Sequence, residues 1–374
     1  MDPILRWARG KQFEAIRLIQ TFVECESPSD SPKQLALFND LLADSLGSEA
    51  ECKKAGTNLI CEFKFAAAKR TQILALGHSD TVWPMGTLKT MPFREGDGRL
   101  WGPGVLDMKS GLVFFIFAMK ALKELEVPVR HKILLQVNSD EETGSRMSRA
   151  LTERNAIRSQ SVLVLEPGTG LTGKLKTARK GIGDYRLIVH GAAAHAGVDF
   201  EKGASAVVEL ARQIEKIAGF THLKKGITVN PGVISGGTRS NVIAAGAQAH
   251  IDIRVPRLRD FAGLDAKFRA LKPFDRRCRL ELSGGLNRPP LERTKSVIAL
   301  FRLARKLGKE LGVEVEESST GGGSDGNFSG ALGIPTLDGV GSVGEGAHAP
   351  DESILVNRIA DRIALLAKLV SAIP

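Results

Sequence analysis

Three consecutive carboxylates, Asp140, Glu141 and Glu142, follow the apolar run Ile-Leu-Leu-Gln-Val at residues 133–137. Such a run is typical of a buried strand, and open α/β sheets place their ligand sites at the carboxyl ends of strands. Acids this close together repel one another unless cations or protons offset their charge. The plain alternative is a solvated turn before a helix, because acids are also favoured near a helix N-terminus.

Further residues of metal-ligand type stand at comparable places in the chain. His78 and Glu166 each follow an apolar run, whereas Asp107 and His348 lie in loops that contain Gly and Pro. Imidazoles and carboxylates without a thiolate suit zinc or a similar ion. Together with Glu142 they make five ligands. Five ligands are more than one catalytic zinc site uses. They fit two ions, about 3.5–4 Å apart, that share a bridging carboxylate.

Each of these residues also has an ordinary explanation. A single loop histidine is more often a surface or hydrogen-bonding residue than a metal ligand. Asp107 could cap the helix that follows it, and Glu166 could be a simple strand-end acid. These explanations account poorly for the joint occurrence of such residues at strand ends, so we favour a metal site.

The elements around these residues alternate between strand and helix. Strands are predicted at 58–65, 71–77, 132–137, 161–165 and 334–337. Helices are predicted at 4–25, 33–46, 110–125, 295–311 and 354–373, with a further helix after residue 145. This order predicts an α/β fold in which helices cover both faces of a mostly parallel sheet.

A second domain is predicted within the first, because 374 residues exceed the usual size of a single core. From about residue 180 the predicted strands alternate in polarity, at 185–189, 227–234 and 241–255, and helices are predicted at 204–218 and 260–271. We therefore expect an α+β domain at 180–290, inserted into a metal-binding domain made of 1–179 and 291–374.

The formal net charge of +10 is unevenly distributed. Residues 180–290 carry 18 Lys plus Arg against 10 Asp plus Glu. Such a surplus attracts anionic substrates, and it can also mark a nucleic-acid binder. Because this region lacks a long basic run and interleaved aromatic residues, we favour an anionic small molecule over a nucleic acid.

Other features of the sequence bear on the cellular location of the protein. The longest apolar run, 111–119, falls short of the roughly 20 residues of a membrane span. The first residues include an early acid and lack the pattern of a signal peptide. Cys25, Cys52, Cys61 and Cys278 share no CxxC spacing and suit buried, reduced thiols better than a disulfide framework. These features predict a cytoplasmic protein that does not bind membranes.

Seven short motifs resemble, in their order, those of the dizinc family of aminoacylases and glutamate carboxypeptidases. They are Gly-His-Ser-Asp-Thr-Val at 77–82, Gly-Pro-Gly-Val-Leu-Asp-Met-Lys at 102–109, Asp-Glu-Glu-Thr-Gly at 140–144, Glu-Pro at 166–167, Gly-Ala-Ala-Ala-His-Ala-Gly at 191–197, Thr-Gly-Gly-Gly-Ser-Asp at 320–325 and Gly-Ala-His at 346–348. The resemblance spans His78 to His348 and continues into the flanking helices. Each motif alone is a weak signal, and their common order makes the resemblance specific.

For the metal centre, the resemblance implies two Zn²⁺ ions per chain, for which Co²⁺ or Mn²⁺ could substitute. Asp107 would bridge the two ions. His78 and Glu166 would complete the ligands of one ion, and Glu142 and His348 would complete those of the other.

The resemblance also implies roles for residues beside these ligands. Glu141 would be the general base and then the general acid, since adjacent side chains at a strand end can point in different directions. Asp80 would orient the imidazole of His78. The peptide bond between Asp107 and Met108 would be cis.

The predicted insert resembles the lid and dimerisation domain of that family. This implies a homodimer in which His195 reaches the active site of the partner subunit and polarises the scissile carbonyl. Asn241 and Arg254 match positions that hold the carboxylate of the substrate, and Arg288 and Gly323 are further candidates. A planar guanidinium suits a carboxylate, although most arginines are surface charges and His195 could be a plain loop residue.

The residue at position 166 bears on the reaction. A Glu there resembles the carboxypeptidase and acylase branches, whereas aminopeptidase-like members carry Asp. The resemblance therefore implies hydrolysis of an amide or peptide bond beside a free carboxylate, and a glutamate carboxypeptidase that releases a C-terminal glutamate-like amino acid is our first hypothesis. The alternatives are an N-acyl-amino-acid deacylase, of the aminoacylase or acetylornithine deacetylase type, and a catalytically silent homologue that binds a carboxylate ligand.

Overall fold

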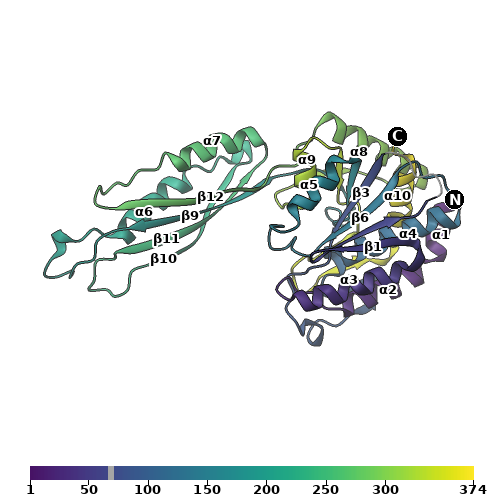
Figure 1. The fold of residues 1–374 in the computed structure, drawn as a ribbon, viewed down its shortest axis with the longest axis horizontal. Helices are drawn as coiled ribbons and strands as arrows, with labels where there is room; N and C mark the ends of the chain where they lie inside the picture. Colours follow the sequence, from purple (N-terminus) through teal and green to yellow (C-terminus); the bar gives the residue numbers. More distant parts are fainter. Residues whose placement is uncertain (66–70) are drawn as a thin grey trace. The chain divides into compact units, whose positions relative to one another are not determined.

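The computed structural model describes residues 1–65 and 71–374, and the chain divides into two compact units (Figure 1). The main unit comprises Met1–Ala178, Arg293–Thr320 and Ser324–Pro374. The inserted unit comprises Arg179–Glu292 and Gly321–Gly323. The sequence predicts the insert at 180–290. The main difference between this prediction and the structure is the segment Gly321–Gly323, which belongs to the inserted unit. That segment packs with the inserted unit because Arg179 donates hydrogen bonds to its carbonyl oxygens.

The main unit is built on an eight-stranded sheet in the order β1-β2-β6-β3-β7-β14-β8-β13. Its four central strands, β6 (Lys132–Asn138), β3 (Gln72–His78), β7 (Ser159–Val164) and β14 (Thr336–Asp338), run parallel. The strands β1 (Ala50–Ala55), β2 (Asn58–Phe63) and β8 (Leu175–Arg179) pair antiparallel, and β13 (Glu317–Thr320) is the far edge. The predicted α/β class is confirmed, although the sequence did not reveal β1, β8 and β13.

Helices cover both faces of this sheet (Figure 1). Along β3, Ile73 and Ala75 belong to one hydrophobic cluster, and Leu74 and Leu76 belong to another. The first cluster includes α1 (Pro3–Gly10), α2 (Gln12–Glu24), α3 (Pro32–Leu46), α4 (Ser110–Glu124), α8 (Lys295–Leu311) and α10 (Ile359–Ala372). On the second face, α5 (Arg149–Ile157) packs against α9 (Gly326–Ala331) and β7. A strand with both faces buried shows continuous apolar character, which explains why the sequence identified β3.

A small antiparallel sheet, in the order β15-β16-β5-β4, completes the main unit. It joins β4 (Arg94–Gly96) and β5 (Arg99–Trp101) to β15 (Gly344–Glu345) and β16 (Ser353–Leu355). The last helix was predicted to start at residue 354, but that segment is β16 and α10 starts at Ile359. The pairing of β5 with β16 brings the segment after residue 101 beside the segment before residue 353.

The inserted unit is a four-stranded antiparallel sheet in the order β10-β11-β9-β12. Its strands are β9 (Gly181–His190), β10 (Thr228–Gly236), β11 (Gly246–Val255) and β12 (Arg279–Arg288). The helices α6 (Ala206–Ala218) and α7 (Leu258–Arg269) pack against this sheet and share its core. Alternate residues of β9, among them Tyr185, Leu187 and Val189, are buried, which is the pattern of a sheet covered on one face.

The structure corrects the prediction of four reduced cysteines. Cys52 on β1 lies directly opposite Cys61 on β2, and the two form a disulfide, whereas Cys25 and Cys278 are free. The sequence missed this pair because it did not reveal β1. Disulfides are rare in a reducing cytosol. The cytoplasmic location therefore stays a prediction, and this pair is an observation against it.

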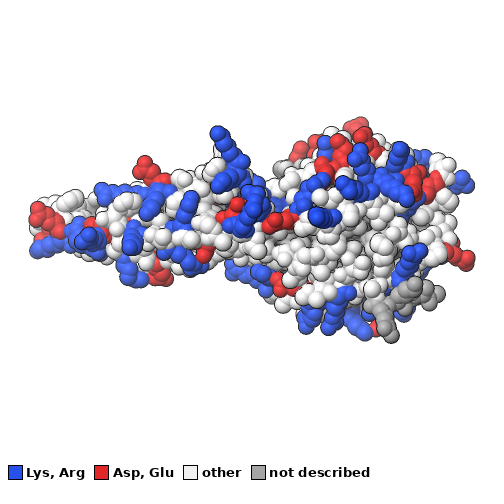
Figure 2. Space-filling view, turned by 90° about the horizontal axis from the view of Figure 1, so that it is seen from above, with Lys and Arg blue, Asp and Glu red and all other residues white. Residues whose placement is uncertain are grey.

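Figure 2 shows lysine and arginine side chains over both units, with acidic side chains among them. Within the described part of the chain, no helix combines the length and the apolar character that crossing a membrane requires.

The disulfide can be tested by counting thiols. Alkylation of the denatured, unreduced protein should label Cys25 and Cys278 alone, and reduction should expose Cys52 and Cys61 as well, as read by peptide mass spectrometry. Replacing both bonded cysteines by serine should lower the free energy of unfolding by about 2–3 kcal/mol, because the bond closes a short loop in the unfolded chain. Labelling of all four cysteines before reduction would show that the pair is not oxidised.

Candidate metal centre

The structure brings the five predicted ligands of the main unit together at one edge of the sheet. His78 is the last residue of β3, and Glu166 lies just beyond β7. Glu142 lies in the turn after β6, Asp107 in the irregular turn before α4, and His348 in the loop between β15 and β16. Because the carboxyl ends of parallel strands meet at the same edge, residues far apart in sequence become neighbours.

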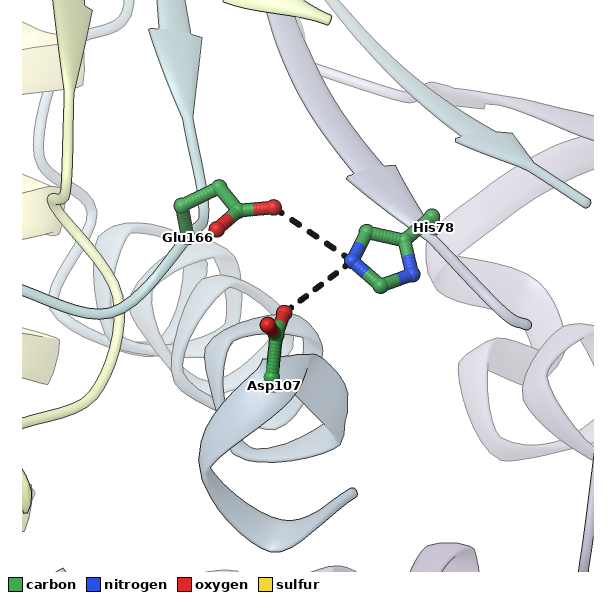
Figure 3. A group of neighbouring side chains, drawn as sticks. All are labelled: His78, Asp107 and Glu166. Atoms are coloured by element: carbon green, nitrogen blue, oxygen red, sulfur yellow. Dashed lines mark hydrogen bonds and ion pairs between the residues drawn. The ribbon is translucent and has the colours of Figure 1, made fainter. Parts of the chain in front are cut away.

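His78, Asp107 and Glu166 form the first triad (Figure 3). His78 Nε2 lies 3.2 Å from Asp107 Oδ1 and 3.3 Å from Glu166 Oε1. His78 and Glu166 are buried. The three side chains point toward one another, as ligands of one cation must.

Asp107, Glu142 and His348 form the second triad. His348 Nε2 lies 3.3 Å from Asp107 Oδ2 and 3.3 Å from Glu142 Oε1. Asp107 thus directs one oxygen to each triad, which is the arrangement of a carboxylate that bridges two cations. His348 has a φ of 62°, an uncommon conformation for a residue other than glycine that is often found at functional sites.

Two local features mark the segment around Asp107. The peptide bond between Asp107 and Met108 is cis, as predicted. Gly111 lies in the first turn of α4, where a Cβ atom would collide with the carbonyl oxygen of Leu165. The glycine therefore allows the helix that follows Asp107 to approach the end of β7.

The charges of the centre shift the pKa values of its members. Burial by itself would lower the pKa of His78, but contacts with Asp107 and two further carboxylates raise it well above its usual value. Contacts with Asp107 and Glu142 raise the pKa of His348 to about 10. Burial would raise the pKa of Asp107, yet both histidines lower it. The carboxylates thus strongly favour positive charge among them, whether it comes from protons or from cations.

The donor set fits a pair of divalent cations. Each triad offers one imidazole nitrogen and two carboxylate oxygens that all lie within 4.8 Å of one another. Glu142 Oε1 is buried and accepts no hydrogen bond from the residues that the structure describes, although it faces His348. A buried oxygen of this kind costs free energy unless a cation or a donor offsets it. Nitrogen and oxygen ligands without sulfur suit zinc, cobalt or manganese.

Asp80 lies two residues after His78 and is buried. His78 Nδ1 is 2.8 Å from the main-chain carbonyl oxygen of Asp80 and 3.5 Å from its carboxylate. The carboxylate also accepts hydrogen bonds from the backbone N–H groups of Glu141, at 3.2 Å, and Glu142, at 3.1 Å. Asp80 thus fixes the turn that carries both glutamates, a contact that the sequence did not reveal.

Glu141 lies beside the first triad and belongs to neither triad. It lines a small cavity together with His78, Glu166 and Asp325. Glu141 and Glu142 therefore occupy different places around the two triads. This position, next to the candidate ligands and outside both triads, suits a group that moves protons.

The turn with the three acids is supported by a buried network that the sequence did not reveal. Asp325 accepts hydrogen bonds from Asn138 Nδ2 at 2.6 Å and from Ser145 Oγ at 2.5 Å. These two residues flank the turn at residues 139–144. Asp325 belongs to the motif at 320–325, but the motif does not say which segment its carboxylate holds.

Two of the predicted residues of the inserted unit lie on adjoining loops. His195 and Asn241 are exposed, and His195 forms a β-bridge with Val242. The backbone N–H of Ala196 donates to the carbonyl oxygen of Asn241 at 3.0 Å. These loops lie at the end of the sheet where β11 begins and β9 ends.

The other three predicted residues lie at the opposite end of the same sheet. Arg254 on β11 and Arg288 on β12 both pair with Ile182 of β9. A Cβ atom on Gly323 would lie 2.9 Å from Cδ of Arg288, so the glycine permits close packing there. Arg254 Nε bonds the carboxylate of Asp252 at 2.9 Å, and Arg288 is buried. Within one chain, Asn241 and Arg254 therefore do not come together.

The chain matches the model of the peptidase family M20/M25/M40 over residues 74–372, which include both triads. The chain belongs to this family. The family predicted from the seven motifs is thereby confirmed, and the chain is a hydrolase of the M20 type.

Relatives in the M20 family support the same assignment. Carboxypeptidase G2 from Pseudomonas sp. (strain RS-16) is 28% identical over 387 residues, covering 99% of this chain and 91% of the relative. Acetylornithine deacetylase from Klebsiella pneumoniae (strain 342) is 30% identical over 317 residues, covering 80% of this chain and 79% of the relative. The crystal structure of aminopeptidase PepT from Bacillus cereus ATCC 10987 shares the fold, with a TM-score of 0.80, 22% identity and coverage of 97% and 98%.

Metal content tests the two-triad centre. The zinc-loaded wild type should hold two ions per chain by elemental analysis, and His348→Ala should hold about one, because this residue belongs to the second triad alone. His222→Ala, at an exposed histidine of the inserted unit, is the matched control and should keep both ions. A wild type that retains no more than one tight ion would contradict a shared bridge.

Proposed function

We propose that the chain is a dinuclear metal hydrolase that cleaves an amide or peptide bond beside a free carboxylate, releasing a C-terminal glutamate-like amino acid. The observation that carries this proposal is the pair of triads that share Asp107, with one oxygen facing each imidazole. The similarity to carboxypeptidase G2, which extends over nearly the whole length of both chains, supports the choice of reaction.

In this proposal, His78, Asp107 and Glu166 hold one ion, and Asp107, Glu142 and His348 hold the other. Zinc bound there would lower the pKa of water to about 7 and polarise the carbonyl of the substrate. Glu141 takes the proton from the attacking water and delivers it to the nitrogen of the leaving group. Asp80 keeps the imidazole of His78 and the backbone of Glu141 in place for this transfer.

The arginine end of the inserted sheet is our candidate for binding the substrate carboxylate. Arg254 and Arg288 flank Ile182 from the two neighbouring strands. A bidentate guanidinium contact gives both charge and direction to such a carboxylate. Both arginines remain candidates for this contact: Arg254 Nε bonds the carboxylate of Asp252 at 2.9 Å, and Arg288 is buried.

The second candidate function is deacylation of an N-acyl amino acid. It is favoured by the 30% identity with acetylornithine deacetylase over most of that enzyme. Both reactions use the same metal chemistry and differ in the amine that is released. A substrate panel therefore separates them.

The test uses the zinc-loaded protein with acyl-glutamate, acyl-aspartate, acyl-ornithine and dipeptides that end in glutamate, with the released amines identified by mass spectrometry. Release of glutamate should dominate. Amidation of the carboxylate beside the scissile bond should lower kcat/KM by roughly 10- to 100-fold, as for a lost hydrogen bond to a charged group. Preferred release of ornithine would establish the deacylase instead. Binding of these compounds without turnover would indicate the silent homologue.

Glu141→Gln is the companion variant for this panel. It should retain two ions and lose roughly 10²- to 10⁴-fold in kcat, because the amide cannot accept the proton. Glu95→Gln, at an exposed residue of β4, should behave as the wild type. Turnover close to normal in Glu141→Gln would remove this residue from the mechanism.

We also propose a homodimer formed through the inserted unit. Val207 and Val208 on α6, and Val233 and Ile234 on the edge strand β10, are exposed apolar residues. Exposed apolar residues on a helix and on a neighbouring edge strand suit a protein interface. The dimer would also resolve the separation between the loop of His195 and the arginine end of the sheet.

The separation follows from strand length. β11 is 10 residues long, which spans roughly 30 Å at about 3.3 Å per residue. A dipeptide extends over only about 7 Å. One subunit therefore cannot present both ends of this sheet to the same small substrate, and we propose that His195 serves the site of the partner subunit.

Complementation between two inactive variants tests this proposal. When His195→Ala and Glu141→Ala chains exchange subunits, about half of the dimers should be mixed, and each should contain one site with both groups intact. Roughly a quarter of the wild-type sites should then return, because the base and the electrophile act separately. If the mixture stays inactive although exchange is shown by mass-tagged chains, His195 does not act in trans.

A further inference from the structure

Glu352 is a buried acid outside the two triads. Its exposed fraction is 0%, and its carboxylate accepts four hydrogen bonds. Oε1 accepts from the backbone N–H groups of Leu106, at 2.8 Å, and Asp107, at 3.0 Å. Oε2 accepts from the backbone N–H of Gly104, at 2.9 Å, and from Nε1 of Trp83, at 2.8 Å.

All four partners of Glu352 are N–H donors, so the position requires a group that only accepts hydrogen bonds. An ionised carboxylate offers about four acceptor sites on its two oxygens, and such charge-assisted bonds are stronger than neutral ones. Burying a carboxylate is costly unless bonds of this kind offset the loss of water. The side chain is therefore matched to this loop.

The contact joins the two segments that carry ligands of the second triad. Three of the four donors belong to the loop that leads to Asp107, and Glu352 follows His348 in the loop between β15 and β16. The loop between β15 and β16 is closed by two backbone hydrogen bonds, from Ala349 N to Gly346 O and from Glu352 N to Ala349 O. Asp107 Oδ2 and His348 Nε2, 3.3 Å apart, thus lie on segments linked through one carboxylate.

We propose that Glu352 is a positioning residue of the metal centre. It holds the loop of Asp107 so that the two carboxylate oxygens of Asp107 face separate histidines. The inference rests on the proposed dinuclear centre and concerns how tightly metal is held, not which substrate is cleaved. A purely structural role for Glu352 would lower the stability of the fold and leave metal affinity and geometry unchanged. The two roles therefore differ in the metal bound by a folded variant.

Three variants separate these roles. Glu352→Gln keeps the volume, but its amide NH₂ group faces two of the N–H donors. Trp83→Phe removes one donor and leaves the three backbone hydrogen bonds. Asp351→Asn, the matched control, makes the same change of charge at the adjacent exposed residue.

Each variant is stripped of metal, checked for folding by circular dichroism, and titrated with Zn²⁺ against a chromophoric chelator. A parallel titration with Co²⁺ records the visible absorption bands, which report the geometry of the ligands. Glu352→Gln should bind zinc roughly 10- to 100-fold more weakly than the wild type, as for other residues that support metal ligands. Its cobalt bands should also change, whereas Asp351→Asn should match the wild type in both measurements.

Wild-type affinity and cobalt bands in folded Glu352→Gln would overturn the positioning role, however far its melting temperature falls. An equal loss in Asp351→Asn would also overturn it, because the effect would then come from charge alone. If Glu352→Gln does not fold, Trp83→Phe decides: weaker zinc binding supports the role, and unchanged binding overturns it. These measurements use no substrate, so their outcome is independent of whether the proposed hydrolysis is found.

Discussion

The crowding of carboxylates around Asp107 is the constraint on which the rest of the main unit depends. Acids from three different elements converge with two imidazoles, and these acids raise the pKa of both histidines. Binding of divalent cations displaces such protons, so metal affinity depends on pH. Without positive charge among them, these carboxylates would repel one another. The fold must therefore hold the acids together against their own repulsion.

The parallel sheet fixes the positions of most of these residues. The strands β3, β6 and β7 are buried on both faces and end at one edge, so His78, Glu142 and Glu166 start from positions that the core itself determines. Asp107 and His348 come from loops, and each of these loops needs additional support. The small sheet supplies part of it, since β5 precedes one loop and β16 follows the other.

The sequence was most informative where local pattern and chemistry coincide. The buried strands β3, β6, β7 and β14 and most of the long helices were predicted, because apolar periodicity is a local signal. The helix predicted at 4–25 is in fact two helices, α1 and α2. Ligand-type residues at strand ends marked His78, Glu142 and Glu166, whereas Asp107 and His348 lie in loops, and the family resemblance implied the same five residues. The strands β1, β8, β12 and β13 were missed; of these, β1 and β12 are partly exposed and have weak apolar patterns. The disulfide was missed for the same reason, since its two cysteines meet only through the register of β1 with β2.

The sequence also could not show which contacts long-range hydrogen bonds make. Asp80 has a motif that suggested its contact with His78, but nothing in its spacing indicated the two backbone N–H groups at Glu141 and Glu142. Glu352 had no signal of its own, because three of its four partners are backbone groups and all four lie more than two hundred residues away. Backbone donors carry no residue identity, so such contacts appear only in three dimensions.

The surroundings of each acid now separate ligands from supports, although all of them are carboxylates near strand ends or loops. Asp80 and Glu352 accept hydrogen bonds from backbone N–H groups, which offset part of their cost of burial without any cation. Glu142 Oε1 accepts none from the described residues and faces an imidazole instead. An acid whose oxygens are already used by N–H donors has little capacity left for a metal ion. The N–H donors around these two buried carboxylates therefore support our proposal that Asp80 and Glu352 hold the candidate ligands in place.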